Sequence, residues 1–386
     1  MPVKLTRLAI TCILASFTLF SYSQSVIIEN GIKLPKDSVI SKQLISSLNG
    51  FLAQKEKPNR ENAFVLKDDL LETSALLDEM KGMEANAKAN DFFKPYLNNV
   101  VKQGGNNFII QYSYMGVLDN APILRASFTL VAKGEGDKFY FSSPLKQNTA
   151  DWKTKKMGNV TYHYKDTLAK ADAKKYLEAV NFYDRKLKVP EQPIAFYYCD
   201  NLPEVLQLLG INYKSDYNGS AGDDLSSHEN NECLMVAGGR IYQYSFDLHD
   251  LWHERLRYVI GTEKTNRPVD EGCAYLYGGS WGYSWPEVLA KFKKFAADNP
   301  DADWLTLYKE NKIFDGTEKP MYVPYFLNAL IAQKIEKEKG FAPVIELLTC
   351  GKRQQGDENY FKALEKVTGI SKADFNAEMW KLIKGS

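Results

Sequence analysis

Two of the chain's four histidines, His249 and His253, stand four positions apart, with Asp250 directly after the first. On an α-helix, residues four apart lie on one face, separated by about 6 Å of rise and about 40° of rotation. Two imidazoles placed in this way can reach one metal ion, and an acid directly after the first can face the same ion. The spacing therefore predicts a helix that carries a metal-binding face.

A third ligand is available eighteen residues after His253, where Glu271 stands in the segment Asp-Glu-Gly-Cys-Ala. Two histidines, one carboxylate and an open fourth position are typical of a catalytic zinc site, whereas structural zinc sites are closed. With four histidines in 386 residues, six pairs give about a 3% chance of one spacing of four, and about 0.4% when an acid must follow. The alternative is a helix with one solvated histidine and one histidine in a buried hydrogen bond.

The length of 386 residues favours two domains, each large enough to bury its own core. The charged fraction of 25% is that of an ordinary globular protein. A formal net charge of +1 gives no electrostatic argument for binding nucleic acid or an anionic membrane.

The N-terminus has the pattern of a secretory signal peptide at residues 1–23. Lys4 and Arg7 precede an apolar run from 8 to 20, and small residues lead to a cleavage site between Ser23 and Gln24. The run is shorter than the roughly 20 residues that a membrane span needs, and no later segment is apolar enough. The sequence therefore predicts a secreted or periplasmic protein with no transmembrane span after cleavage.

In an oxidising compartment, the cysteines of the mature chain could form one or two disulfides, and the sequence does not define their pairing. The cysteines of the mature chain are Cys199, Cys233, Cys273 and Cys350.

Residues 24–155 are expected to form an α+β domain. Apolar residues at 39–52 follow helical spacing, and charge-rich helical segments are predicted to continue to about Val101. Strands are predicted at 108–114, 123–132 and 139–141. This order of elements weakly resembles the cystatin-like folds of nuclear transport factor two and its relatives, and it implies a scaffolding role.

Residues 156–386 are expected to form a second domain with a small mixed sheet and a helical C-terminal half. Strands are predicted at 160–164, 194–198 and 234–244, with helices at 167–187 and 203–210. The segment 214–231 is predicted to be a loop, in which His228 and Glu229 are either solvated, which is favoured, or a contact for substrate or metal. Asp247 suits the start of the histidine helix, and Pro268 and Gly278-Gly279 bound the helix of Glu271. Further helices are predicted from Pro286 to the C-terminus. The predicted buried stripe of the histidine helix is Leu248, Trp252, Leu256 and Val259.

Taken in order, residues 160–384 resemble the gluzincin metallopeptidases, in particular the bacterial peptidase MA-like domains. The resemblance rests on the strand at 194–198 with its following helix, the strand at 234–244, the H-D-x-x-H helix, the Asp-Glu-Gly-x-Ala segment and the closing helices. It implies that His249, His253 and Glu271 hold Zn²⁺. It also implies that a peptide or protein substrate pairs with the strand near Gly238, Gly239 and Arg240, and that Tyr322 or Tyr325 helps to hold the oxyanion.

The departure from the family is Asp250, because family members carry Glu at this position as the base that takes a proton from the attacking water. Aspartate is one methylene shorter, and a misplacement of about 1 Å can cost roughly 100-fold in rate. Tyr275, four residues after Glu271, is a further candidate for a polar role beside the metal ligands. Two functions follow from the sequence: a secreted zinc metallopeptidase weakened by Asp250, or a catalytically inactive, metallopeptidase-like binding protein of the cell envelope.

Overall fold

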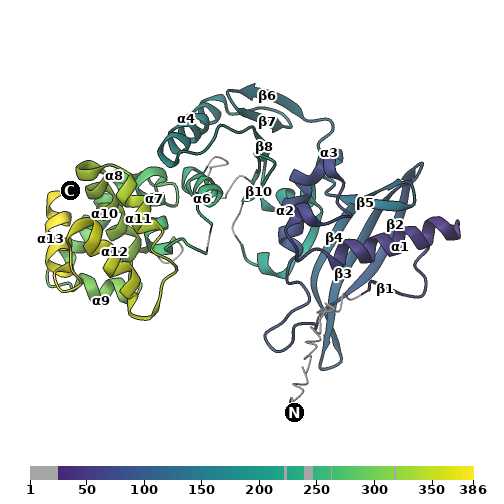
Figure 1. Cartoon of the computed structure of the whole chain (residues 1–386), viewed down its shortest axis with the longest axis horizontal. Coiled ribbons are helices and arrows are strands. Elements are labelled where there is room, and N and C mark those ends of the chain that lie inside the picture. Colours follow the sequence, from purple (N-terminus) through teal and green to yellow (C-terminus); the bar gives the residue numbers. More distant parts are fainter. Residues whose placement is uncertain (1–24, 221–223, 239–246, 262, 317–318) are drawn as a thin grey trace, which may run out of the picture.

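The computed structural model describes residues 25–220, 224–238, 247–261, 263–316 and 319–386. It is a mixed α/β protein in which the C-terminal helices gather on one side and the longest strands on the other (Figure 1). A smaller sheet lies between them, with α4 on one of its faces (Figure 1).

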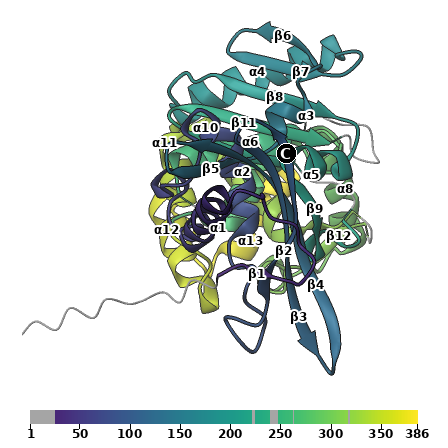
Figure 2. The ribbon, with the colours of Figure 1, turned by 90° about the vertical axis from the view of Figure 1, so that its right-hand side faces the viewer.

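The N-terminal sheet has the strand order β1-β2-β3-β4-β5. Its strands are β1 (Ile27–Ile28), β2 (Lys94–Gly104), β3 (Asn107–Leu118), β4 (Ala121–Glu135) and β5 (Lys138–Ser142). Helix α1 (Ser38–Ala53) begins where the Asp37 carboxylate accepts hydrogen bonds from the amides of Val39 and Ile40. Together with α2 (Leu70–Met80), it covers an apolar core on the sheet (Figure 2). The short helix α3 (Leu145–Asn148) follows β5.

The second sheet has the order β10-β11-β8-β7-β6. Its strands are β6 (Lys153–Met157), β7 (Val160–Tyr164), β8 (Ile194–Cys199), β10 (Asp224–Glu229) and β11 (Glu232–Gly238). Strands β7, β8 and β11 run parallel, and the two outer strands pair antiparallel. Helix α4 (Lys170–Leu187) connects β7 to β8, and α5 (Leu202–Leu209) ends at Gly210 in a left-handed conformation.

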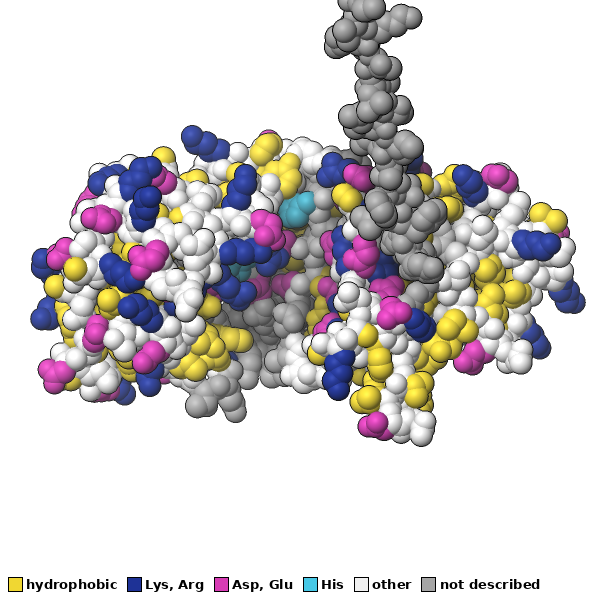
Figure 3. Space-filling view, turned by 60° about the horizontal axis from the view of Figure 1, so that its bottom comes forward, with side chains coloured by type: hydrophobic (Ala, Val, Ile, Leu, Met, Phe, Trp, Pro, Cys, Tyr) yellow, Lys and Arg dark blue, Asp and Glu magenta, His cyan; other side chains and the backbone are white. Residues whose placement is uncertain are grey.

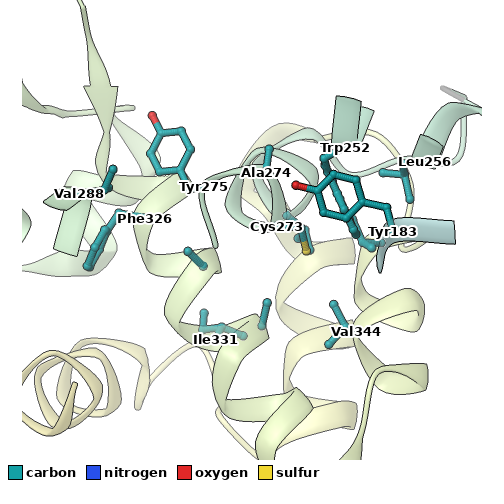
Figure 4. Close-up of a cluster of buried hydrophobic side chains, with 14 of the residues drawn as sticks. Tyr183, Trp252, Leu256, Cys273, Ala274, Tyr275, Val288, Phe326, Ile331 and Val344 are labelled. Atoms are coloured by element: carbon teal, nitrogen blue, oxygen red, sulfur yellow. The ribbon is translucent and has the colours of Figure 1, made fainter. Parts of the chain in front are cut away.

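The C-terminal half is built from helices around the buried helix α10. The helices are α6 (Leu248–Val259), α7 (Arg267–Gly278), α8 (Trp285–Asp298), α9 (Trp304–Lys309), α10 (Val323–Lys339), α11 (Ala342–Leu348), α12 (Glu358–Thr368) and α13 (Phe375–Gly385). The short strands β12 (Ile313–Asp315) and β13 (Met321–Tyr322) pair before α10. Figure 4 shows part of this core, with Trp252 of α6, Cys273 of α7 and Val344 of α11 among its buried side chains.

An ion pair with a fully buried arginine connects α6 to α4. Arg255 of α6 has no exposed surface, and its Nε donates to Asp184 Oδ1 of α4 at 2.6 Å. Breaking such a pair leaves an uncompensated charge in the interior, which costs about 3–5 kcal/mol. The position of α6 on α4 is therefore strongly specified.

Most predicted elements are confirmed, including the strands at 108–114, 123–132, 139–141, 160–164 and 194–198 and the helix of Glu271. The predicted helical segments up to Val101 are confirmed at α2 but wrong at their end, because β2 occupies 94–104 and pairs with both β1 and β3. Long-range pairing there overrides the local, charge-rich composition. Val259 is 44% exposed, so it does not belong to the buried stripe of α6.

The predicted loop at 214–231 is also wrong in its second half. Residues 224–229 form β10, which pairs with β11 through a tight turn at Asn230 and Asn231. Both asparagines have positive φ, 50° and 63°, which is the conformation that such a two-residue hairpin turn requires. His228 and Glu229 therefore lie on a strand, and Glu229 is buried where it accepts a hydrogen bond from the Ser74 hydroxyl.

The division of the chain at residue 155 stays a prediction, and two elements bear on it. β6 begins at Lys153, and β9 (Ile211–Lys214) from the later part of the chain pairs with β4 of the first sheet. The two halves are thus connected by strand pairing as well as by the chain.

Three findings concern the predicted export of the protein and its disulfides. The signal segment 1–23 lies outside the described residues. Within the part of the chain that the structure describes, no helix is both long and apolar enough to cross a membrane. Cys199, Cys233, Cys273 and Cys350 are free thiols, so no disulfide forms among these four residues.

Candidate metal centre

Helix α6 places both histidines on one face, where they are half-buried. The helix begins at Asp247, whose carboxylate accepts a hydrogen bond from the backbone amide of His249 at 2.8 Å. Trp252 and Leu256 are buried behind the histidines. The local sequence therefore fixes both the start of the helix and the rotation that turns the two imidazoles outward.

Helix α7 brings Glu271 to the histidines through two close approaches at glycine. A Cβ on Gly272 would lie 2.6 Å from Asn328 Cβ of α10, and a Cβ on Gly278 would lie 2.5 Å from the amide nitrogen of His249. Neither approach is possible for a larger residue without a shift of the backbone. Gly278 thus sets the approach of α7 to α6, and Gly272 sets its approach to α10.

The ligand atoms of His249, His253 and Glu271 lie within 4.8 Å of one another. The two Nε2 atoms are 3.2 Å apart, and Glu271 Oε2 lies 3.4 Å from Nε2 of His249 and 3.9 Å from Nε2 of His253. The structure thus brings together the three residues that the spacing predicted, and this group could hold a metal ion.

Each imidazole is oriented through its other nitrogen. His249 Nδ1 donates to the carbonyl oxygen of Gly279 at 2.8 Å, and His253 Nδ1 donates to Asp270 Oδ1 at 2.9 Å. The same Asp270 oxygen accepts from Trp252 Nε1 at 3.0 Å. With both protons on Nδ1, each neutral ring turns its Nε2 lone pair toward the common point, which is the tautomer that metal binding requires.

The electrostatics of the group favour a positive charge at its centre. Burial acts to lower the pKa of His249, but its bond to Glu271 and the charges of Glu271, Asp250 and Asp247 raise that pKa to about 9. Burial acts to raise the pKa of Glu271, and the two histidines and Arg267 lower it to about 2. Three acceptor atoms that face one point are held together well only when a cation lies among them.

Zinc fits this donor set. Tetrahedral zinc with nitrogen and oxygen ligands at its usual bond lengths separates neighbouring ligand atoms by about 3.3–3.5 Å. The two shorter separations here, 3.2 and 3.4 Å, agree with that value, and the third is 3.9 Å. Only the distance between His253 Nε2 and Glu271 Oε2 has to shorten when zinc binds.

The three residues line a cleft of about 850 Å³. Asp250, Tyr275, Tyr322 and Tyr325 line the same cleft. Figure 3 shows a hollow on one face of the molecule, with a His side chain set back among Lys and Arg side chains. A cleft of this size can admit a short stretch of peptide or another ligand of similar dimensions.

Asp250 also borders a smaller cavity of about 130 Å³ between α6 and strands β10 and β11. Tyr275 is buried, and its hydroxyl accepts a hydrogen bond from the backbone amide of Tyr322 at 3.4 Å. This contact holds Tyr322 at the wall of the cleft. Burial raises the pKa of Tyr275 well above its usual range, so that hydroxyl stays protonated.

The predicted substrate strand has a different environment from the metal group. Gly238 pairs with Cys199 of β8, and a Cβ there would lie 2.7 Å from the backbone carbon of Asn201. Close packing of β11 against the start of α5 accounts for this glycine. Gly239 and Arg240 lie outside the described residues. Strand β11 has β8 on one side and β10 on the other, so β10 is the outer strand of the sheet on this side.

Three residues of the site were not predicted. Asp270 and Gly279 orient the two rings, and Arg267 places Nη2 3.1 Å from Glu271 Oε1. The spacing of four between Arg267 and Glu271 could have predicted their contact, because oppositely charged residues four apart lie next to each other on a helix. His228 joins none of the metal ligands; its Nε2 lies 3.6 Å from Glu254 Oε2.

Comparison with protein-family models and with curated sequences identified no relative of this chain.

Proposed function

We propose that this chain is a zinc-dependent peptide hydrolase of the gluzincin type. The observation that carries the proposal is the convergence of His249 Nε2, His253 Nε2 and Glu271 Oε2, with both rings oriented from behind, at the wall of a large cleft. Orienting hydrogen bonds of this kind accompany nearly all histidines that bind a metal. A solvated histidine does not need such a bond and a core histidine does, but neither requires its second ring nitrogen to face another imidazole and a carboxylate.

In this proposal, His249, His253 and Glu271 hold the zinc ion, and Gly279 and Asp270 fix the histidine rings. Zinc in such a site lowers the pKa of a water molecule toward 7 and polarises a carbonyl group. Arg267 binds Oε1 of Glu271 and so leaves Oε2 for the metal side. The protein's contribution is therefore a ligand set whose tautomers and directions are fixed in advance.

Asp250 is the proposed general base, which takes a proton from the attacking water and delivers it to the leaving amine. It follows His249 on α6, is half-buried and lines the cleft. Its intrinsic acidity differs from that of glutamate by about 0.4 pKa unit, so reach is the property that changes. Tyr322 and Tyr325, which line the same cleft, are the candidates for donating to the oxyanion.

The finer architecture belongs to the same proposal. The N-terminal α+β unit would be a cystatin-like scaffold, and the rest a zincin-like domain of a secreted or periplasmic protein. A binding protein without turnover is the second candidate, and the shorter side chain at Asp250 is the observation that favours it. Both candidates require the metal ligands, and only the first requires Asp250 to reach the water.

Metal analysis and peptide cleavage test the two candidates in sequence. The purified protein is loaded with zinc, dialysed and compared with His249→Ala/His253→Ala, with one zinc per chain expected for the wild type only. Equal zinc in both proteins would refute the site. Hydrolysis of a quenched fluorescent peptide library, with and without chelator, then separates hydrolase from binding protein.

A further inference from the structure

The mouth of the metal cleft is lined by basic side chains, of which the proposed chemistry uses only one, Arg267, through its contact with Glu271. Arg257, Arg267 and Lys352 line the cleft together with the three metal ligands. Their side chains are 56%, 77% and 59% exposed, respectively. They come from α6, from α7 and from the segment after α11, so the positive charges surround the site from three elements.

The acidic residues of the same cleft lie deeper and already have partners. The side chains of Asp270 and Glu271 are 17% and 11% exposed and face the two histidines. Asp247 caps α6 through the amide of His249. Negative charge is therefore concentrated at the floor, and the exposed charge at the mouth is positive.

The partners of the three basic residues leave them able to accept a ligand. Arg267 contacts Glu271 through Nη2, although most of its side chain faces solvent. Lys352 pairs with Glu263, which is itself 82% exposed, and such surface pairs are worth little and exchange readily. Arg257 donates to Glu254 through Nη1 alone. Arg353, by contrast, is committed to Asp357, Asn311 and two backbone carbonyls and is structural.

We propose that this cleft selects peptides that carry a carboxylate beside the segment bound at the metal ligands, and that Arg257, Arg267 and Lys352 bind that carboxylate. This inference rests on the proposed role of the cleft as a peptide site. A guanidinium group offers several N–H donors in a fork that matches a carboxylate. The carboxylate comes from an acidic side chain or from the C-terminus of the peptide, and both sources present the same group.

Peptide binding tests the proposal without requiring turnover. Three fluorescently labelled, N-acetylated hexapeptides are titrated into zinc-loaded Asp250→Asn protein, which is chosen to prevent cleavage. The first carries Glu at its central positions and a C-terminal amide, the second carries Gln there, and the third is the Gln peptide with a free C-terminal carboxylate. At 50 mM salt, at least one carboxylate peptide is expected to bind about five to ten times more tightly than the Gln amide. The preference should shrink at 500 mM salt.

The arms of the experiment identify the source of the carboxylate. Tighter binding of the Glu peptide assigns the site to side chains, and tighter binding of the third peptide assigns it to chain ends. Equal affinity for all three peptides would overturn the proposal. The result stands apart from the hydrolase question, because a protein that cleaves every peptide without preference keeps the proposed function and loses this inference. A protein that cleaves no peptide but binds carboxylate peptides more tightly loses the proposed function and keeps this inference.

Variants at the mouth locate the interaction. Arg257→Gln and Lys352→Gln, singly and together, are expected to bring the preference toward one while the Gln amide binds within about twofold of its original affinity. Arg60→Gln is the matched control, because Arg60 is 68% exposed, pairs with Glu229 and lies outside the cleft. A preference that is unchanged in the double variant at zinc saturation would also overturn the proposal.

Discussion

The amide nitrogen of His249 lies 2.5 Å from the position that a Cβ on Gly278 would occupy. The last turn of α7 therefore lies against the first turn of α6, and the next residue, Gly279, uses its carbonyl to orient the His249 ring. One close contact thus fixes the distance between two helices that supply different metal ligands. The geometry of the metal centre therefore requires a residue without a side chain at position 278.

Gly278→Ala should weaken metal binding more than it weakens the fold. The added methyl group needs about 1 Å of separation between α6 and α7, which moves His249 away from Glu271. We expect zinc affinity to fall at least tenfold, with a loss of about 1–3 kcal/mol in unfolding free energy. Competition with a chromophoric chelator measures the first quantity, and urea unfolding measures the second.

Gly261→Ala is the control for that substitution. Among the described residues beyond its chain neighbours, no atom lies within 4 Å of a Cβ at residue 261, and the position does not require a positive φ. It should leave zinc affinity unchanged. Equal zinc affinity of Gly278→Ala and wild type would show that the approach of α7 to α6 does not position the ligands.

Asp270→Ala should lower zinc affinity by about 10- to 100-fold, because it removes the acceptor that orients His253 and bonds Trp252. Asp270→Asn should lose less, since its amide oxygen can still accept from Nδ1. The exposed Asp301→Ala controls for the loss of one negative charge. Chelator competition at several pH values distinguishes a misoriented ring from a general loss of charge, and an affinity equal to wild type in Asp270→Ala would contradict the orienting role.

The rules that predicted the metal group are local, and the features that sequence reasoning missed are not. A spacing of four on one helix places His249 beside His253 whatever the rest of the fold does. The alignment of Glu271 with them depends on the packing of Gly272 and Gly278 against other helices, which the sequence shows only as two glycines. The sequence offered Glu271 as the third ligand through its position eighteen residues after His253, and the family resemblance implied the same residue.

Two of the strands that the sequence did not predict, β10 and β2, have the same physical explanation. In β10, half-buried and buried residues alternate, and the strand lies at the edge of its sheet. Its sequence is therefore rich in polar residues and does not resemble a buried strand. The Asn230–Asn231 turn carried a usable hairpin signal. β2 is held by neighbours on both sides, one of them only two residues long, and no local pattern contains that information.

Asp250→Glu tests whether reach limits the proposed catalysis. If the cleft has the spacing that a glutamate needs, kcat/KM for peptide hydrolysis should rise about tenfold or more, because the general-base contribution is typically 10²- to 10⁴-fold. Asp250→Asn should abolish activity and leave zinc bound. The comparison uses one quenched peptide and all three proteins, with chelator-treated samples as the blank. Activity that falls in Asp250→Glu would mean that the cleft is shaped around the shorter acid.

Protonation of His228 should make the fold more stable at neutral than at alkaline pH. Burial acts to lower the pKa of His228, but the Cys233 thiol and the Glu254 carboxylate raise it to about 9, and the Tyr258 ring lies against it. A folded-state pKa above the unfolded value of about 6.5 means that the stabilisation is complete below pH 6.5. It declines between pH 6.5 and 9 and is lost above that range.

His228→Gln removes this titration and serves as the comparison. The wild type should exceed the variant in unfolding free energy by about 2 kcal/mol at pH 6, and the difference should shrink as the pH rises to 9.5. Urea unfolding of both proteins at pH 6, 7.5 and 9.5 measures it, with chelator present so that metal binding does not contribute. Curves that run parallel across this range would mean that His228 is neutral in the folded protein, and that its contact with Glu254 is an ordinary polar contact.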